Sequence, residues 1–134
     1  MSERGYSVLI IDMTYDSEKD FVVEGFPTVE LANEFARRRV RDSVEELRAA
    51  NQTGEELRRL WHTFGEDASV IGGEPHYAGS HELDYFIEHP ASAAERDWQE
   101  IERSATGRTP LFVRRLSRTD GGAEGRSEVD SNRD

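Results

Sequence analysis

The stretch TVELANEFARRRVRDSVEEL, residues 28–47, decides the fold of this chain. Its apolar side chains recur at helical spacing and therefore lie along one side of a helix of about four turns. These apolar positions are Ala32, Phe35, Ala36, Val40, Val44 and Leu47. Thr28 is a suitable N-cap, and the helix should end near Asn51. The stretch predicts one long amphipathic helix that buries this apolar stripe.

The position of a residue relative to the stripe predicts its role. Phe35 lies in the middle of the stripe between small neighbours, so its ring should fill the core. Arg38 lies off the stripe, so we expect its replacement by alanine to change stability by less than about 0.5 kcal/mol.

Two strands are expected before this helix. Residues 6–15 contain four consecutive β-favouring side chains, from Val8 to Ile11, which is typical of a central strand. A polar connector, residues 16–20, separates them from a second apolar segment, residues 21–26. This spacing predicts an antiparallel hairpin.

Shorter elements are expected after the long helix. Thr53 and Glu56 have capping-box spacing and open a second helix, for which Gly65 is a natural C′ residue. A brief strand over residues 68–71 and a short helix from Ser80 follow.

A second capping box, Ser92 with Glu95, opens a further helix, and residues 111–116 form a last strand. The element order is therefore β-β-α-α-β-α-α-β. This order predicts an α+β fold with a four-stranded antiparallel or mixed sheet and helices packed on one face.

The composition excludes several classes of protein. The 134 residues include 17 Lys+Arg and 28 Asp+Glu, a formal net charge of -11, which opposes general binding to nucleic acid or to anionic membranes. There is no cysteine, so disulfides, thiolate nucleophiles and cysteine-ligated metals are excluded. Without an apolar run of membrane-spanning length or a signal peptide, we expect a cytoplasmic protein.

Lys19 is the single lysine of this acidic chain. Such a composition is typical of proteins from salt-loving microbes, and codon bias toward arginine is the alternative explanation. We expect residues 1–119 to form a single α+β domain. Residues 120–134 are predicted to be a disordered acidic tail, because Val129 is their only sizeable apolar side chain.

Residues 72–90 are the most unusual segment, because they contain three of the four histidines together with several carboxylates and two tyrosines. Imidazole and carboxylate groups suit a divalent metal. However, Tyr85 stands where a metalloprotease motif starting at His81 needs its second histidine, so we expect no metal site. A solvated loop and helix start is the alternative interpretation.

Two other places carry candidate residues. Asp12 follows four apolar residues and either ends the buried part of its strand or points into a cleft. Trp61 and His62 either line a pocket or serve as a core ring and a histidine near a helix C-terminus.

No phosphate-binding glycine loop and no Gly-x-Ser-x-Gly motif occurs. We therefore expect a non-catalytic binding or assembly module, forming a homodimer through open sheet edges and needing no cofactor. The alternative is a small-ligand or metal-dependent enzyme with a pocket at residues 72–90, so the sequence leaves enzymatic activity open. The candidate ligand-binding residues are Asp12, Trp61, His62, His76, Tyr77, His81, Asp84 and Tyr85.

Overall fold

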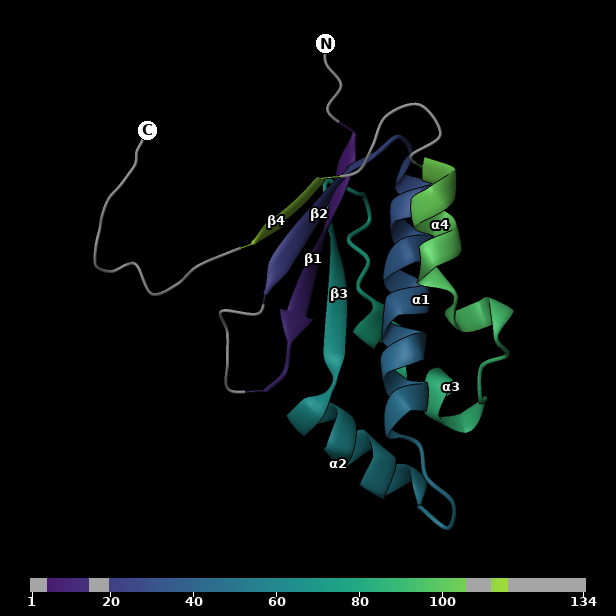
Figure 1. Ribbon diagram of the computed structural model, residues 1–134. Coiled ribbons are helices and arrows are strands. Elements are labelled where there is room, and N and C mark those ends of the chain that lie inside the picture. Colours follow the sequence, from purple (N-terminus) through teal and green to yellow (C-terminus); the bar gives the residue numbers. More distant parts are fainter. Residues whose placement is uncertain (1–4, 15–19, 106–111, 116–134) are drawn as a thin grey trace, which may run out of the picture.

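The computed structural model describes residues 5–14, 20–105 and 112–115 (Figure 1). Its strands are β1 (Tyr6–Asp12), β2 (Phe21–Phe26), β3 (Glu66–Ile71) and β4 (Phe112–Arg115). Its helices are α1 (Val29–Leu47), α2 (Gly54–Phe64), α3 (Leu83–Glu88) and α4 (Trp98–Ala105), with 3-10 turns η2 (Gly79–Glu82) and η3 (Ala94–Arg96). The predicted α+β class is confirmed. The predicted tail, residues 120–134, lies outside the described residues.

The strands form an antiparallel sheet in the order β3-β1-β2-β4, so β1 is central. Val8 pairs with Val23 of β2 and with Val70 of β3, and all three side chains are buried. These three valines form a layer of side chains that faces the helices. Because side chains alternate along a strand, Leu9 faces the opposite side of the sheet. Figure 1 shows α1 lying along one face of the sheet, with α4 beside it.

Helix α1 begins as predicted, since the Thr28 hydroxyl accepts a hydrogen bond from the Leu31 amide at 3.1 Å. The apolar stripe is buried over most of its length, from Ala32 to Val44. The helix ends at Leu47, before the predicted end near Asn51, because Arg48 leaves the helical conformation. Its guanidinium donates hydrogen bonds to the carbonyls of Phe86 and Ile87, which ties this end of α1 to α3.

Arg38 lies off the buried stripe, as predicted, but it is half-buried and makes contacts with a second helix. Its Nε lies 2.7 Å from the Glu34 carboxylate, and its Nη1 lies 2.7 Å from the Glu100 carboxylate. The same Nη1 donates a hydrogen bond to the Asp97 carbonyl. Arg38 therefore joins α1 to the start of α4. Helical periodicity predicts on which side of α1 this residue lies, but not which other helix it contacts.

Helix α2 opens with the predicted capping box, in which Thr53 and Glu56 each accept a hydrogen bond from the other's amide. Gly65 follows the helix but has φ -86°, so it is not the left-handed residue typical of C′. A Cβ atom there would lie 2.6 Å from the Trp61 carbonyl oxygen. Glycine stands at this position because the backbone passes too close to Trp61 for any side chain.

The capping box of Ser92 and Glu95 also forms, but it opens the single turn η3 rather than the expected helix. Helix α4 starts separately at Trp98, where Asp97 accepts a hydrogen bond from the Glu100 amide.

The free edge of β3 is partly covered by the chain that follows it. Ala78 forms a bridge with Ser69, and the Val70 amide donates a hydrogen bond to the Tyr77 carbonyl at 2.8 Å. The expected open edge is therefore occupied on this side. Among the described helices, none has the length and apolar character needed to cross a membrane.

Candidate functional site

A cavity of about 230 Å³ lies at the end of the sheet where β1 and β3 meet α1. Asp12 and Glu66 are direct partners across the β1–β3 ladder, and both line this cavity. Its other lining residues are Arg39, Asp42, Ser43, Glu46, Phe64, Gly65 and Trp98. We call this cavity the acidic pocket.

The alternation of side chains along the strands and the helical spacing along α1 explain why these residues converge on one pocket. Asp12 alternates in phase with Val8 and Ile10, so it extends the helix-facing layer beyond the apolar part of β1. Glu66 extends the same layer on β3. The α1 residues follow at helical spacing, which places them on one side of the helix. They are Arg39, Asp42, Ser43 and Glu46.

Arg39 and Glu66 form the central ion pair of the pocket. Arg39 Nε donates to Glu66 Oε1 at 3.1 Å, and Arg39 Nη2 donates to Glu66 Oε2 at 2.9 Å. The Arg39 guanidinium also lies 4.2 Å from the centre of the Trp98 ring, a cation–π contact. Glu66 is therefore held in position by a planar, two-point contact.

The pKa of Glu66 is nevertheless raised above its ordinary value. Burial is the main cause, because it disfavours the charged form, and the negative charges of Asp12 and Glu46 act in the same direction. The opposing attraction of Arg39 does not compensate. Glu66 thus takes up a proton more readily than a solvent-exposed glutamate.

The remaining carboxylates differ in how fully they are engaged. Asp42 accepts hydrogen bonds from Arg96 at 2.7 Å and from the Trp98 indole at 3.2 Å. Asp12 accepts from the Thr14 amide and hydroxyl through a single oxygen, Oδ1. Glu46 is exposed and makes no hydrogen bond or ion pair with any residue that the structure describes. Asp12 and Glu46 therefore keep unused acceptor capacity beside the cavity.

The residues around the acidic pocket carry four carboxylates and one guanidinium. Among residues 5–14, 20–105 and 112–115, no three histidine or carboxylate side chains converge closely enough to hold a metal ion. The pocket is thus negatively charged and has two aromatic residues in its lining, Phe64 and Trp98. Phe64 is 58% exposed.

Of the candidate residues expected from the sequence, Asp12 is the one that lines this pocket. Trp61 is 1% exposed and belongs to the core, where its ring contacts that of His62 edge-on at 5.1 Å. His62 itself is exposed near the C-terminus of α2. This placement corresponds to the core-packing interpretation of the pair.

Three of the other candidates gather beside β3. The rings of His76 and Tyr77 each lie edge-on to His81, at 5.8 and 6.0 Å. His76 Nε2 is 3.2 Å from the hydroxyl of Ser69. The Tyr77 hydroxyl donates to Glu82 at 2.6 Å, and burial together with this hydrogen bond raises the pKa of Tyr77.

The last two candidates lie on α3. Asp84 forms an ion pair with Arg58 of α2, and Tyr85 is 48% exposed with its ring stacked on His89 at 4.0 Å. The structure therefore does not join the residues of segment 72–90 to Asp12 in one pocket.

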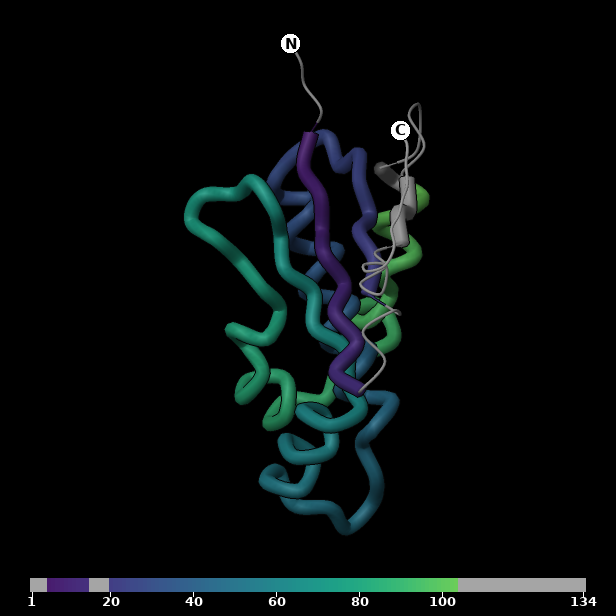
Figure 2. Tube along the Cα trace, turned by 90° about the vertical axis from the view of Figure 1, so that its left-hand side faces the viewer, coloured from purple at the N-terminus to yellow at the C-terminus, as the bar shows by residue number. Residues whose placement is uncertain are grey.

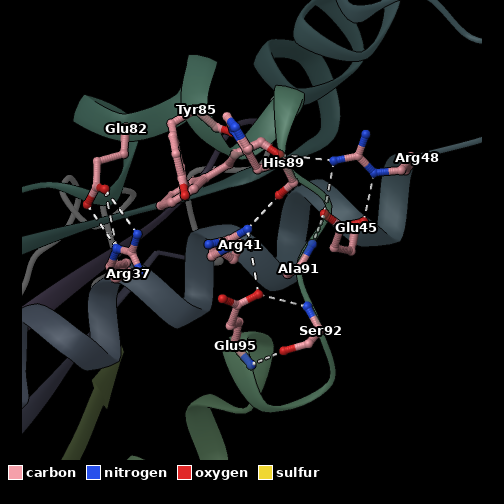
Figure 3. Close-up of polar contacts among 11 residues, drawn as sticks. Arg37, Arg41, Glu45, Arg48, Glu82, Tyr85, His89, Ala91, Ser92 and Glu95 are labelled. Atoms are coloured by element: carbon pink, nitrogen blue, oxygen red, sulfur yellow. Dashed lines mark hydrogen bonds and ion pairs between the residues drawn. The ribbon is translucent and has the colours of Figure 1, made fainter.

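A second polar cluster lies between α1 and the segment that carries α3 and η3 (Figure 3). Its centre is Arg41, which is 2% exposed and donates a hydrogen bond to the His89 carbonyl. The Arg41 guanidinium lies 4.9 Å from the centre of the Phe86 ring and 4.0 Å from the Glu95 carboxylate. These contacts fasten the α3–η3 segment to α1.

Sequence reasoning did not identify Arg39, Glu66 and Trp98 as site residues. Glu66 precedes Ala68 by two positions and Val70 by four, so all three side chains lie on the same face of the strand. This spacing could have extended the strand back from its predicted start at residue 68 and placed Glu66 on the helix-facing side. Only the packing of α4 against α1 brings Trp98 to Arg39.

The chain matches no protein-family model, no curated protein and no solved structure.

Proposed function

We propose that this protein is a non-catalytic binding module that holds a small organic cation in the acidic pocket. The observation that carries the proposal is the composition of the pocket lining, which holds four carboxylates and two aromatic rings. Arg39 pairs with Glu66 and Arg96 pairs with Asp42, which leaves Asp12 and Glu46 without an arginine partner among the described residues. Carboxylates attract a cation, and aromatic faces add cation–π stabilisation.

The arginine of the pocket already illustrates this chemistry. The Arg39 guanidinium is held between a carboxylate, Glu66, and the face of Trp98. The acceptors that Arg39 leaves unused are Glu46 and the second oxygen of Asp12, with Phe64 nearby in the lining. An ammonium group placed there would find the same combination of acceptor and ring.

The size of the cavity limits the ligand. A volume of about 230 Å³ is below the range of roughly 300–1,000 Å³ found for drug-sized ligands. The pocket therefore suits an amine of a few heavy atoms or the cationic end of a longer molecule. An organic cation is favoured over a bare metal ion, which needs several converging ligands.

The proposal is tested by titrating the protein with propylammonium while following tryptophan fluorescence. Trp98 lines the pocket and Trp61 lies in the core, so the variant Trp61→Phe leaves Trp98 as the reporter. We expect a saturable change with a dissociation constant of about a millimolar, as is usual for so small a ligand. Propionate, an anion of similar size, should give no saturable change.

A matched pair of variants links the signal to the pocket. Glu46→Gln, which removes a charge without removing a hydrogen bond, should weaken propylammonium binding several-fold. Glu30→Gln removes an exposed charge elsewhere on α1 and should leave binding unchanged. Equal binding of propionate, or equal effects of the two substitutions, would show that the response does not come from this pocket.

The raised pKa of Glu66 makes the expected binding depend on pH. Above this pKa Glu66 is ionised and binding is strongest, and binding weakens as the pH falls through the raised pKa. The decline should begin at a higher pH than for a glutamate of ordinary pKa, 4.5. Propylammonium titrations between about pH 4 and pH 8 measure this dependence, and Glu66→Gln should flatten its upper part. A wild-type profile that matches the variant's profile would remove Glu66 from the binding site.

A further inference from the structure

We propose that the ligand of the acidic pocket is an amphipathic amine, whose ammonium group enters the cavity while its apolar group covers the ring of Phe64. This ligand class rests on the proposed function and makes it more specific. The cavity of about 230 Å³ suits the cationic end of a longer molecule, so the rest of that molecule lies where the cavity opens to solvent. Phe64 lines the cavity and is 58% exposed, so its ring lies at this opening.

The position of Phe64 on α2 explains why a large apolar ring remains exposed there. Phe64 follows Trp61 by three residues and Leu57 by seven, a spacing that places the three side chains on the same side of the helix. Leu57 and Trp61 are buried in the core, whereas Phe64 is the last residue of α2. The apolar side of α2 therefore continues beyond the core to the acidic pocket.

The Phe64 ring offers an aromatic surface that the protein itself leaves largely uncovered. The other ring of the lining, Trp98, already has the Arg39 guanidinium 4.2 Å from its centre. In the part of the chain that the structure describes, no arginine lies over Phe64 and no aromatic ring contacts it. An apolar group placed there removes the exposed part of the ring from water, which favours binding.

The charges of the pocket determine which kind of molecule can cover Phe64. The negative charges of Asp12 and Glu46 act on Glu66, so both carboxylates lie close to it in the same cavity. Arg39 compensates only Glu66. A molecule that covers Phe64 takes water away from the neighbouring carboxylates, which costs free energy unless the molecule brings a positive charge. An uncharged apolar molecule or an anion is therefore disfavoured, and an apolar molecule with an ammonium group is favoured.

The experiment compares propylammonium with phenethylammonium, which carries a phenyl group on a similarly short chain. Two-dimensional NMR titrations of the full chain give both dissociation constants and show that each variant is folded. Because a buried methylene group contributes about four-fold in affinity, we expect phenethylammonium to bind about ten-fold more tightly than propylammonium. Phenethyl alcohol, which has the ring without the charge, should bind at least about ten-fold more weakly than phenethylammonium.

Phe64→Ala should reduce the preference for phenethylammonium to about two-fold or less. The ratio of the two dissociation constants excludes contacts that both ammonium groups share, including a cation–π contact with Phe64. Ile71→Ala is the matched control, because it removes an apolar side chain that is 48% exposed, a fraction close to that of Phe64. Strand β3 runs from the pocket to the other end of the sheet (Figure 2), and Ile71 is its last residue, so this variant should keep the full preference.

The possible results separate this proposal from the function on which it rests. If neither amine binds, the proposed function is wrong and the ligand class falls with it. If both amines bind equally well, or if Phe64→Ala leaves their ratio unchanged, the pocket still binds cations but the amphipathic ligand is wrong. Binding of phenethyl alcohol as tight as that of phenethylammonium would also overturn the proposal, because the carboxylates would then have no part in recognition.

Discussion

Phe35→Ala is expected to lower the free energy of unfolding by about 3–5 kcal/mol, the usual cost of removing a fully buried phenylalanine ring. Phe35 is 0% exposed, and its ring centre lies 4.9 Å from that of Phe26 and 6.0 Å from that of Trp98. The substitution leaves a cavity between β2, α1 and α4. Since domains of this size have about 5–15 kcal/mol in total, urea unfolding should show a large loss of stability.

Two arginine variants calibrate this result. Arg38→Ala should cost about 1 kcal/mol, because it removes ion pairs to Glu34 and Glu100 that are partly exposed. Arg59→Ala, at an exposed position of α2, should change stability by less than about 0.5 kcal/mol. If Phe35→Ala costs no more than Arg38→Ala, the core assigned to α1 is incorrect.

Gly79→Ala should be the second severe change, with a cost of about 3 kcal/mol measured by the same urea unfolding, at the upper end for overpacking. A Cβ atom at Gly79 would lie 2.7 Å from Val40 Cβ and 3.0 Å from the Ala36 carbonyl oxygen. Val40 is fully buried and Ala36 belongs to the α1 backbone, so neither can move aside cheaply. Turn η2 would have to separate from α1.

A double-mutant cycle identifies the cause. Val40→Ala removes the side chain that the new methyl group meets, so the double variant should be more stable than the sum of the single effects predicts, by about 1–2 kcal/mol. Gly54→Ala is the control, because a Cβ there meets Ile87 at an ordinary 3.4 Å and should have little effect. Additive costs in the cycle would mean that η2 does not pack against Val40.

The sequence was most informative where the determining interactions are local. The caps formed by Thr28 and Thr53 involve residues only three positions away, and the apolar stripe of α1 follows from helical periodicity alone. The consecutive apolar residues of β1 likewise indicated its central position in the sheet. Element type was predictable because each of these signals lies within a single helix or strand and its cap.

Predictions from neighbouring residues failed where contacts with residues far away in the sequence set the end of an element. Arg48 ends α1 because carbonyls of α3, 38 and 39 residues away, accept its hydrogen bonds. Gly65 is required by its closeness to Trp61 rather than by a left-handed backbone. In both cases tertiary packing decided the boundary of an element.

The candidate site shows the same division. The sequence by itself singled out Asp12, a carboxylate at the end of an apolar strand, but it also favoured the histidine-rich segment 72–90. Only the β1–β3 register places Glu66 opposite Asp12, and only the packing of α4 on α1 brings Trp98 over Arg39. The pocket joins residues from opposite ends of the described chain. Its geometry depends on long-range pairing, which sequence periodicity does not encode.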